Sequence, residues 1–157
     1  MDVSLYVLKF AIIPSVVGFI YALILAMYTL KKEAGTEKMV EISKAIQEGS
    51  KAYMLRQFKT AGIFGIILII LLYFGLRPLN EGWQTALCFG IGAFFSALAG
   101  YIGMSVTTRA NARVANAAKK GLKPALKLAF RGGSVTGFSV VSLALLSVAL
   151  LYLLFLN

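Results

Sequence analysis

Four long stretches of this chain contain no charged residue, and they constrain its fold more than any other feature. They cover residues 10–30, 60–76, 82–108 and 132–157. A helix needs about 20 mainly apolar residues to cross the hydrocarbon core of a bilayer. The second stretch is short, but Lys59 and Arg77 at its ends can extend their charges toward the interfaces. The sequence therefore predicts an all-α bundle with four membrane-spanning helices.

The composition agrees with a membrane protein. Charged residues make up 14% of the chain, whereas a soluble domain usually carries about 25%. We assign all 157 residues to one membrane domain and expect a multi-pass integral protein of a prokaryotic cell membrane. Its expected spans are residues 8–30, 60–77, 83–108 and 132–156, and its expected cytoplasmic segments are 31–59 and 109–131.

The basic residues predict the orientation. Of the 16 Lys and Arg residues, seven lie between the first two spans and seven between the last two. Loops rich in Lys and Arg remain on the cytoplasmic side. Both segments should therefore be cytoplasmic, and both chain termini should lie outside. The net charge of +10 would otherwise suggest a nucleic-acid partner, but its confinement to loops between spans argues against one.

The first cytoplasmic segment is expected to be helical and continuous with the second span. Gly35 is expected to break the helix after the first span, and Thr36 is a candidate N-cap residue of the next helix. With no strong helix breaker in between, one helix is predicted over about 37–76, roughly 60 Å long at 1.5 Å per residue. The alternative is an interfacial helix on anionic lipid with a break near Gly49.

The third span is expected to continue as a helix through Ala118. Gly121 suits the end of a helix, and Pro124 suits the first turn of the next one. The segment 109–131 carries seven basic residues and no acidic one. Two roles remain open for it: control of topology with contact to anionic lipid, or formation of an electropositive rim for an anionic substrate. The candidate residues of that basic cytoplasmic rim are Arg109, Arg113 and Arg131.

Small residues recur at helical spacing in the last two spans. Such residues let two helix backbones approach closely inside a membrane. The candidate packing residues are Gly92, Ser96, Gly100, Gly103, Gly133 and Gly137.

No catalytic, cofactor-binding or metal-binding site can be assembled from the residues alone. The spans contain no Asp or Glu, and the chain contains no histidine. Proton relays and cation exchangers usually depend on acidic residues inside the membrane, which argues against a small multidrug or cation exchanger. No phosphate-binding loop and no cluster of carboxylates for Mg²⁺ is present in the sequence.

Several segments nevertheless resemble one family, the membrane-bound, ion-translocating inorganic pyrophosphatases. They occur in the family's order and spacing and cover nearly the whole chain. The segments are 33–39 (EAGTEKM), 46–60 (IQEGSKAYMLRQFKT), 96–104 (SALAGYIGM), 107–115 (TTRANARVA) and 129–137 (AFRGGSVTG). Two departures are Val114, where the family tends to have Thr, and Thr136, where it tends to have Met.

The resemblance implies an enzyme that hydrolyses pyrophosphate with Mg²⁺ at the cytoplasmic side and moves H⁺ or Na⁺ out of the cytoplasm, in some members with a K⁺ dependence. It implies a homodimer whose subunits have roughly sixteen helices in an inner and an outer ring. This chain would be the N-terminal, outer-ring part of a much longer protein. The family's catalytic and gating residues lie on later helices and have no matching positions here. We therefore expect the chain to act as a scaffold, to bind no cofactor itself and to be inactive alone.

A second hypothesis remains open at this point. The chain could be a complete, small four-helix membrane protein that acts as a structural or split subunit without catalysis. Both hypotheses explain the absence of acidic residues from the spans. Neither reveals whether the transported ion would be H⁺ or Na⁺.

Overall fold

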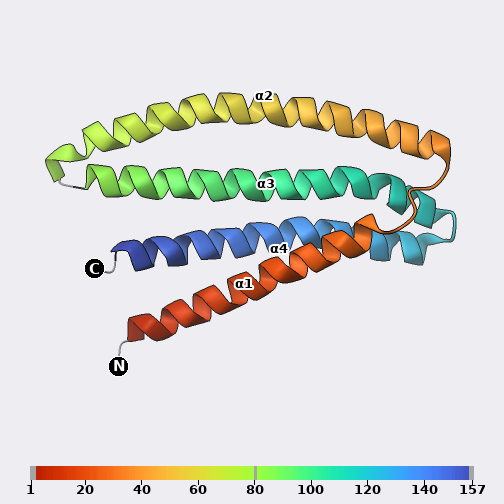
Figure 1. Cartoon of the computed structure of the whole chain (residues 1–157), viewed down its shortest axis with the longest axis horizontal. Coiled ribbons are helices and arrows are strands. Elements are labelled where there is room, and N and C mark those ends of the chain that lie inside the picture. Colours follow the sequence, from red (N-terminus) through yellow and green to blue (C-terminus); the bar gives the residue numbers. More distant parts are fainter. Residues whose placement is uncertain (1–2, 80, 156–157) are drawn as a thin grey trace.

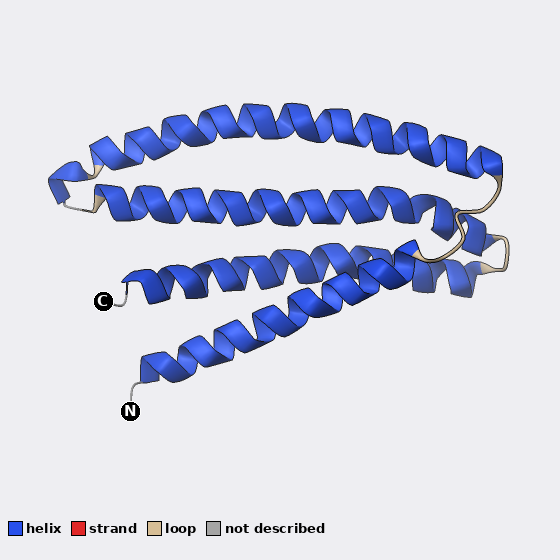
Figure 2. Cartoon of the chain, viewed as in Figure 1, coloured by secondary structure: helices blue, strands red, loops and turns tan. Residues whose placement is uncertain are grey.

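The computed structural model describes residues 3–79 and 81–155, and nearly all of them are helical (Figure 2). No strand occurs among these residues. The elements are α1 (Val3–Leu30), α2 (Glu37–Gly75), the short 3₁₀ helix η1 (Arg77–Leu79), α3 (Gly82–Ala118) and α4 (Leu122–Phe155). Each α-helix is long and apolar enough to cross a membrane, which confirms the predicted four-helix membrane fold.

The four helices lie across the bundle in the order α1, α4, α3 and α2 (Figure 1). The central pair, α3 and α4, makes the most extensive contact, while α1 packs mainly on α4 and α2 packs on α3. The α2–α3 turn lies at the same end of the bundle as the start of α1 and the end of α4 (Figure 1). The α1–α2 and α3–α4 connections meet at the opposite end. This arrangement agrees with the predicted grouping of the two basic segments on one side of the membrane.

Helix α2 is continuous over its 39 residues, about 59 Å at 1.5 Å per residue and twice the hydrocarbon thickness. The predicted long helix is thus confirmed, and the alternative with a break near Gly49 is wrong because Gly49 lies inside regular helix. Thr36 occupies the N-cap position with extended backbone, but its side chain makes no capping hydrogen bond. Gly35 has a φ of +97°, a left-handed conformation that glycine adopts without a steric penalty.

The α3–α4 connection also follows the prediction. Helix α3 ends at Ala118, and Gly121 then adopts a φ of +122°. Helix α4 begins at Leu122, so that Pro124 falls in its first turn. Proline is tolerated there because the first backbone N–H groups of a helix have no intrahelical acceptor.

The interface at the centre of the bundle is built from small side chains at three- and four-residue steps. On α3 the buried residues include Ala99, Gly103, Val106 and Ala110, and on α4 they include Leu128, Gly132, Val135, Ser139 and Ser142. Val106, Val135 and Ala26 of α1 form one buried cluster that joins three helices. Small residues of this kind allow close contact in a membrane, where lipid offers an equally apolar environment to larger side chains.

Helix α1 packs against α4 in its second half and diverges from it toward its N-terminal end (Figure 1). A Cβ atom at Gly18 would lie 2.5 Å from the Ser142 hydroxyl oxygen, so the two helices approach closely at this glycine. The rings of Tyr21 and Phe138 pack edge to face with their centroids 5.0 Å apart. Such aromatic pairs add roughly 0.5–1.5 kcal/mol beyond the area that they bury.

In the part of α2 that precedes its apolar span, Ile42, Ile46 and Tyr53 recur at helical spacing and form an apolar stripe, but a different face of the helix rests on α3. Ser43 and Met54 are buried, whereas Ile42, Ile46 and Tyr53 of the stripe are exposed. The stripe thus remains uncovered by the part of the chain that the structure describes.

The glycines of α3 provide a test of the central interface. A Cβ atom at Gly103 would lie 2.7 Å from Thr136 Cγ2, whereas one at Gly100 would meet nothing within 4 Å. We expect Gly103→Leu to weaken α3–α4 packing by about 1–3 kcal/mol, because overpacking forces side chains from their preferred rotamers. Gly100→Leu has the same helix propensity but no clash within this chain. Unfolding of both variants in mild detergent should show the loss for Gly103→Leu alone, and equal stabilities would contradict this packing.

The orientation can be tested with single cysteines. In a Cys88→Ala background, which removes the only cysteine, Glu81→Cys should react with a membrane-impermeant maleimide on intact cells. Lys123→Cys should react only after permeabilisation, because the positive-inside rule places the α3–α4 loop in the cytoplasm. The opposite labelling pattern would reverse the predicted topology.

Candidate functional site

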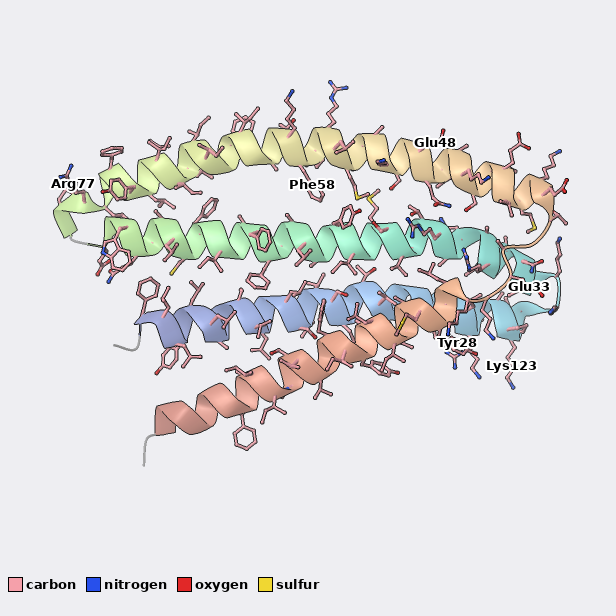
Figure 3. All side chains as sticks on the ribbon, viewed as in Figure 1. Tyr28, Glu33, Glu48, Phe58, Arg77 and Lys123 are labelled. Atoms are coloured by element: carbon pink, nitrogen blue, oxygen red, sulfur yellow. The ribbon has the colours of Figure 1, made fainter. Side chains whose placement is uncertain are left out.

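A basic pocket lies at the end of the bundle where α1 ends and α3 turns into α4. Its volume is about 520 Å³. It is lined by Tyr28, Lys31, Lys32, Glu33, Arg113, Asn116, Ala117, Lys120, Pro124, Lys127, Leu128 and Arg131. Tyr28 and Glu33 lie at this end in Figure 3. We refer to this set of residues as the basic pocket.

The charge of the basic pocket follows from where the helices end. Lys31 and Lys32 come directly after α1, Arg113 lies on the extension of α3 beyond the apolar span, and Lys120 lies in the turn that follows α3. Lys127 and Arg131 stand at four-residue spacing on the first turns of α4, which places them on one side of that helix. Six cationic side chains therefore surround the pocket, and only one carboxylate, that of Glu33, lines it.

Tyr28 is the aromatic wall of the pocket. The Lys32 Nζ atom lies 4.6 Å from its ring centroid, and the guanidinium carbon of Arg131 lies 4.4 Å from it. Both distances fall within the range of cation–π attraction. The ring thus draws together a lysine from the α1–α2 loop and an arginine from α4.

Arg113 connects α3 to the end of α1. Its Nε group donates a hydrogen bond of 3.1 Å to the backbone carbonyl of Leu30, and a terminal nitrogen donates one of 2.7 Å to the carbonyl of Arg109. The Leu30 carbonyl belongs to the last turn of α1 and has no partner within its own helix. Partial burial, and to a lesser degree the charge of Arg109, lowers the pKa of Arg113 from its ordinary value. Arginine nevertheless stays protonated, because its ordinary pKa is far above neutral pH.

The loop beyond α1 is held by a second side chain of α3. The Asn116 side-chain amide donates a hydrogen bond of 3.4 Å to the backbone carbonyl of Glu33. Together with Arg113, it holds the loop that carries Lys31 and Lys32 against α3. These two lysines of the pocket are therefore held in place by the contacts between their loop and α3.

The structure separates the three arginines of the predicted basic rim. Arg113 and Arg131 both line the basic pocket, whereas Arg109 lines a second pocket between α2 and α3 together with Lys51 and Glu48. The rim prediction omitted Tyr28, Lys31, Lys32, Lys120 and Lys127. Lys31 could have been found from the sequence, because it borders the first apolar stretch just as the predicted Arg131 borders the fourth.

The predicted packing residues occupy different environments. Gly103 meets the Thr136 side chain of α4. A Cβ atom at Gly92, Gly100, Gly133 or Gly137 would find no neighbour within 4 Å, and Ser96 is exposed. The glycine of α4 that contacts α3 is Gly132, whose Cβ would lie 3.3 Å from that of Ala110. The role of the remaining small residues in packing against other helices stays a prediction.

The potential metal-ligating side chains are dispersed over the part of the chain that the structure describes. No group of three or more His, Cys, Asp or Glu side chains comes together there. The lining of the basic pocket is cationic, which suits an anion and disfavours a divalent cation.

Four apolar helices, three of which (α2, α3 and α4) are much longer than the membrane is thick, define a multi-pass integral membrane protein. A family model described as inorganic H⁺ pyrophosphatase matches residues 16–157. The chain therefore belongs to the inorganic H⁺ pyrophosphatase family.

The relatives that the chain matches include proteins named as proton pumps and proteins named as sodium pumps. A K⁺-insensitive pyrophosphate-energized proton pump of Methanosarcina mazei is 46% identical over 143 residues. A K⁺-stimulated pyrophosphate-energized sodium pump of Thermotoga maritima is 43% identical over 149 residues. These alignments cover 91% and 93% of this chain but only 21% and 20% of the relatives. The chain thus spans about a fifth of the length of the relatives it matches.

The Arg113 contact predicts a local effect. Arg113→Met should leave the Leu30 carbonyl without its charged donor, and hydrogen bonds to charged groups contribute roughly 1.5–3 kcal/mol. Peptides that cover residues 28–36 should then exchange their amide hydrogens faster. Arg109→Met removes the same charge but no side-chain hydrogen bond to α1, and it should leave that exchange unchanged. Equal exchange in both variants would show that the contact does not hold the loop.

Proposed function

We propose that this chain is the N-terminal, outer-ring part of a membrane pump that couples hydrolysis of inorganic pyrophosphate to outward transport of H⁺ or Na⁺. The observation that carries the proposal is the alignment of about nine tenths of the chain with only a fifth of such a pump. Because relatives of both ion types match at similar identity, the proposal does not choose between the two ions.

In this proposal the chain acts as a scaffold and carries no catalytic residue. Pyrophosphate and the Mg²⁺ that accompanies it would be held by residues outside these 157 positions, as would any K⁺ or Na⁺ on which activity depends. The described residues support this division, because they assemble no cluster of metal ligands. The contribution of the chain would be to hold later helices in place and to present a cationic surface at the side where the substrate arrives.

The exposed small residues of α3 and α4 provide contact surfaces for those later helices. Gly92, Ser96 and Gly100 form one row of α3 at four-residue spacing, and it faces open space within this chain. Gly133 and Gly137 form a similar row on α4. We assign these rows to packing against the remaining helices of the pump, and we expect the assembled pump to be a homodimer in a prokaryotic cell membrane.

The proposal is tested by comparing the full-length protein with the 157-residue chain, each reconstituted in liposomes. The full-length protein should release phosphate from pyrophosphate only when Mg²⁺ is present. The chain alone should give the same background as empty liposomes, because the described residues bring no carboxylate cluster together for Mg²⁺. Mg²⁺-dependent turnover by the chain alone would contradict the scaffold role, and inactivity of the full-length protein toward pyrophosphate would contradict the proposed function.

A further inference from the structure

The basic pocket lies at the boundary between the apolar span and the cytoplasmic segment of two helices. Lys31 is the first charge after the charge-free stretch of α1, and Arg131 is the last charge before that of α4. In a membrane these two positions fall at the level of the lipid headgroups. The pocket is therefore placed where a phospholipid carries its phosphate.

A groove continues from the pocket toward the membrane interior. It has a volume of about 270 Å³ and lies between α1 and α4, lined by Tyr21, Ile24, Leu25, Tyr28, Phe130, Arg131 and Ser134. Tyr28 and Arg131 line both the groove and the basic pocket, so the two cavities adjoin. Tyr21 precedes Lys31 by ten residues, which places the inner end of the groove about 15 Å below that charge along α1.

The two cavities together match the two parts of one ligand. The basic pocket supplies six cations against one carboxylate, which favours a phosphate group. The groove is mainly apolar, and Ile24 and Phe130 in its wall are exposed within this chain. A free phosphate or pyrophosphate ion would use the pocket and leave the groove unfilled, whereas a phospholipid would use both.

We propose that the basic pocket and the α1–α4 groove together bind one anionic phospholipid. Its phosphate lies among Lys31, Lys32, Arg113 and Arg131, and one acyl chain lies in the groove against α1 and α4. A bound lipid would join the end of α1 to the α3–α4 hairpin, in addition to the contacts that Arg113 and Tyr28 already make. This inference does not depend on the proposed pump activity.

The test uses the full-length protein purified in mild detergent and titrated with phosphatidylglycerol or with phosphatidylcholine of the same acyl chains. Native mass spectrometry measures the bound lipid. Phosphatidylglycerol should bind more tightly, because each Lys or Arg near an anionic headgroup contributes roughly 1 kcal/mol. Lys31→Gln combined with Arg131→Gln should weaken this binding by about 30-fold, which corresponds to about two such contributions.

The matched control is Lys119→Gln combined with Lys123→Gln. It removes the same charge from the same end of the bundle, but neither residue lines the basic pocket (Figure 3 labels Lys123). The control should bind phosphatidylglycerol like the parent protein, and Arg131→Lys, which keeps the charge, should retain most of the affinity. An equal loss of phosphatidylglycerol affinity in the control pair would overturn the proposal. The lipid would then be attracted by the overall positive charge at this end of the bundle and not by the basic pocket.

The groove and the source of the phosphate are tested separately. Ile24→Trp should fill the groove and weaken phosphatidylglycerol binding while leaving the basic pocket intact. Inorganic phosphate and pyrophosphate are then added as competitors. If neither anion displaces the lipid at millimolar concentration, the proposal is supported. Displacement at micromolar concentration, or unchanged lipid binding by Ile24→Trp, would identify the pocket as a site for a free anion and overturn the proposal. Gel filtration of each variant checks that it remains folded.

Discussion

The contact between α3 and α4 is the interaction on which the remaining structure depends. In lipid, helix association gains little from burying apolar surface, so it depends on how closely the backbones approach. Gly103 and Gly132 allow that approach, because each lies directly against a side chain of the other helix. Helix α1 then packs on the outer side of α4, and α2 packs on the outer side of α3. Neither outer helix packs against the other in the part of the chain that the structure describes.

The same contact creates the basic pocket. Because α3 and α4 stay together beyond the apolar span, the cations of their turns outside that span are brought to the end of α1. There, Arg113 bonds to the Leu30 carbonyl and Tyr28 attracts Lys32 and Arg131. These contacts offset part of the repulsion among six like charges. The remaining positive potential is available to an anion at the membrane surface.

The chain has two kinds of open surface. One is the set of small-residue rows on α3 and α4, which suits contact with further helices. The other is the pocket and groove beside α1, which suits a lipid with a charged headgroup. Their different chemistry follows from position: the rows lie within apolar spans, whereas the pocket lies where the spans meet the basic segments.

The sequence by itself determined the fold class, the four spans and the long helices, because charge-free stretches and helix-ending residues such as Gly35 and Gly121 act locally. It also determined the family, since the segments that resemble it are contiguous. Only the tertiary structure decided which small residues meet a neighbour, because one residue of shift turns a side chain by about 100° around a helix. It likewise decided that Arg113 and Arg131 share a pocket while Arg109 faces α2. That outcome depends on how separate helices are placed side by side, which spacing along one helix does not encode.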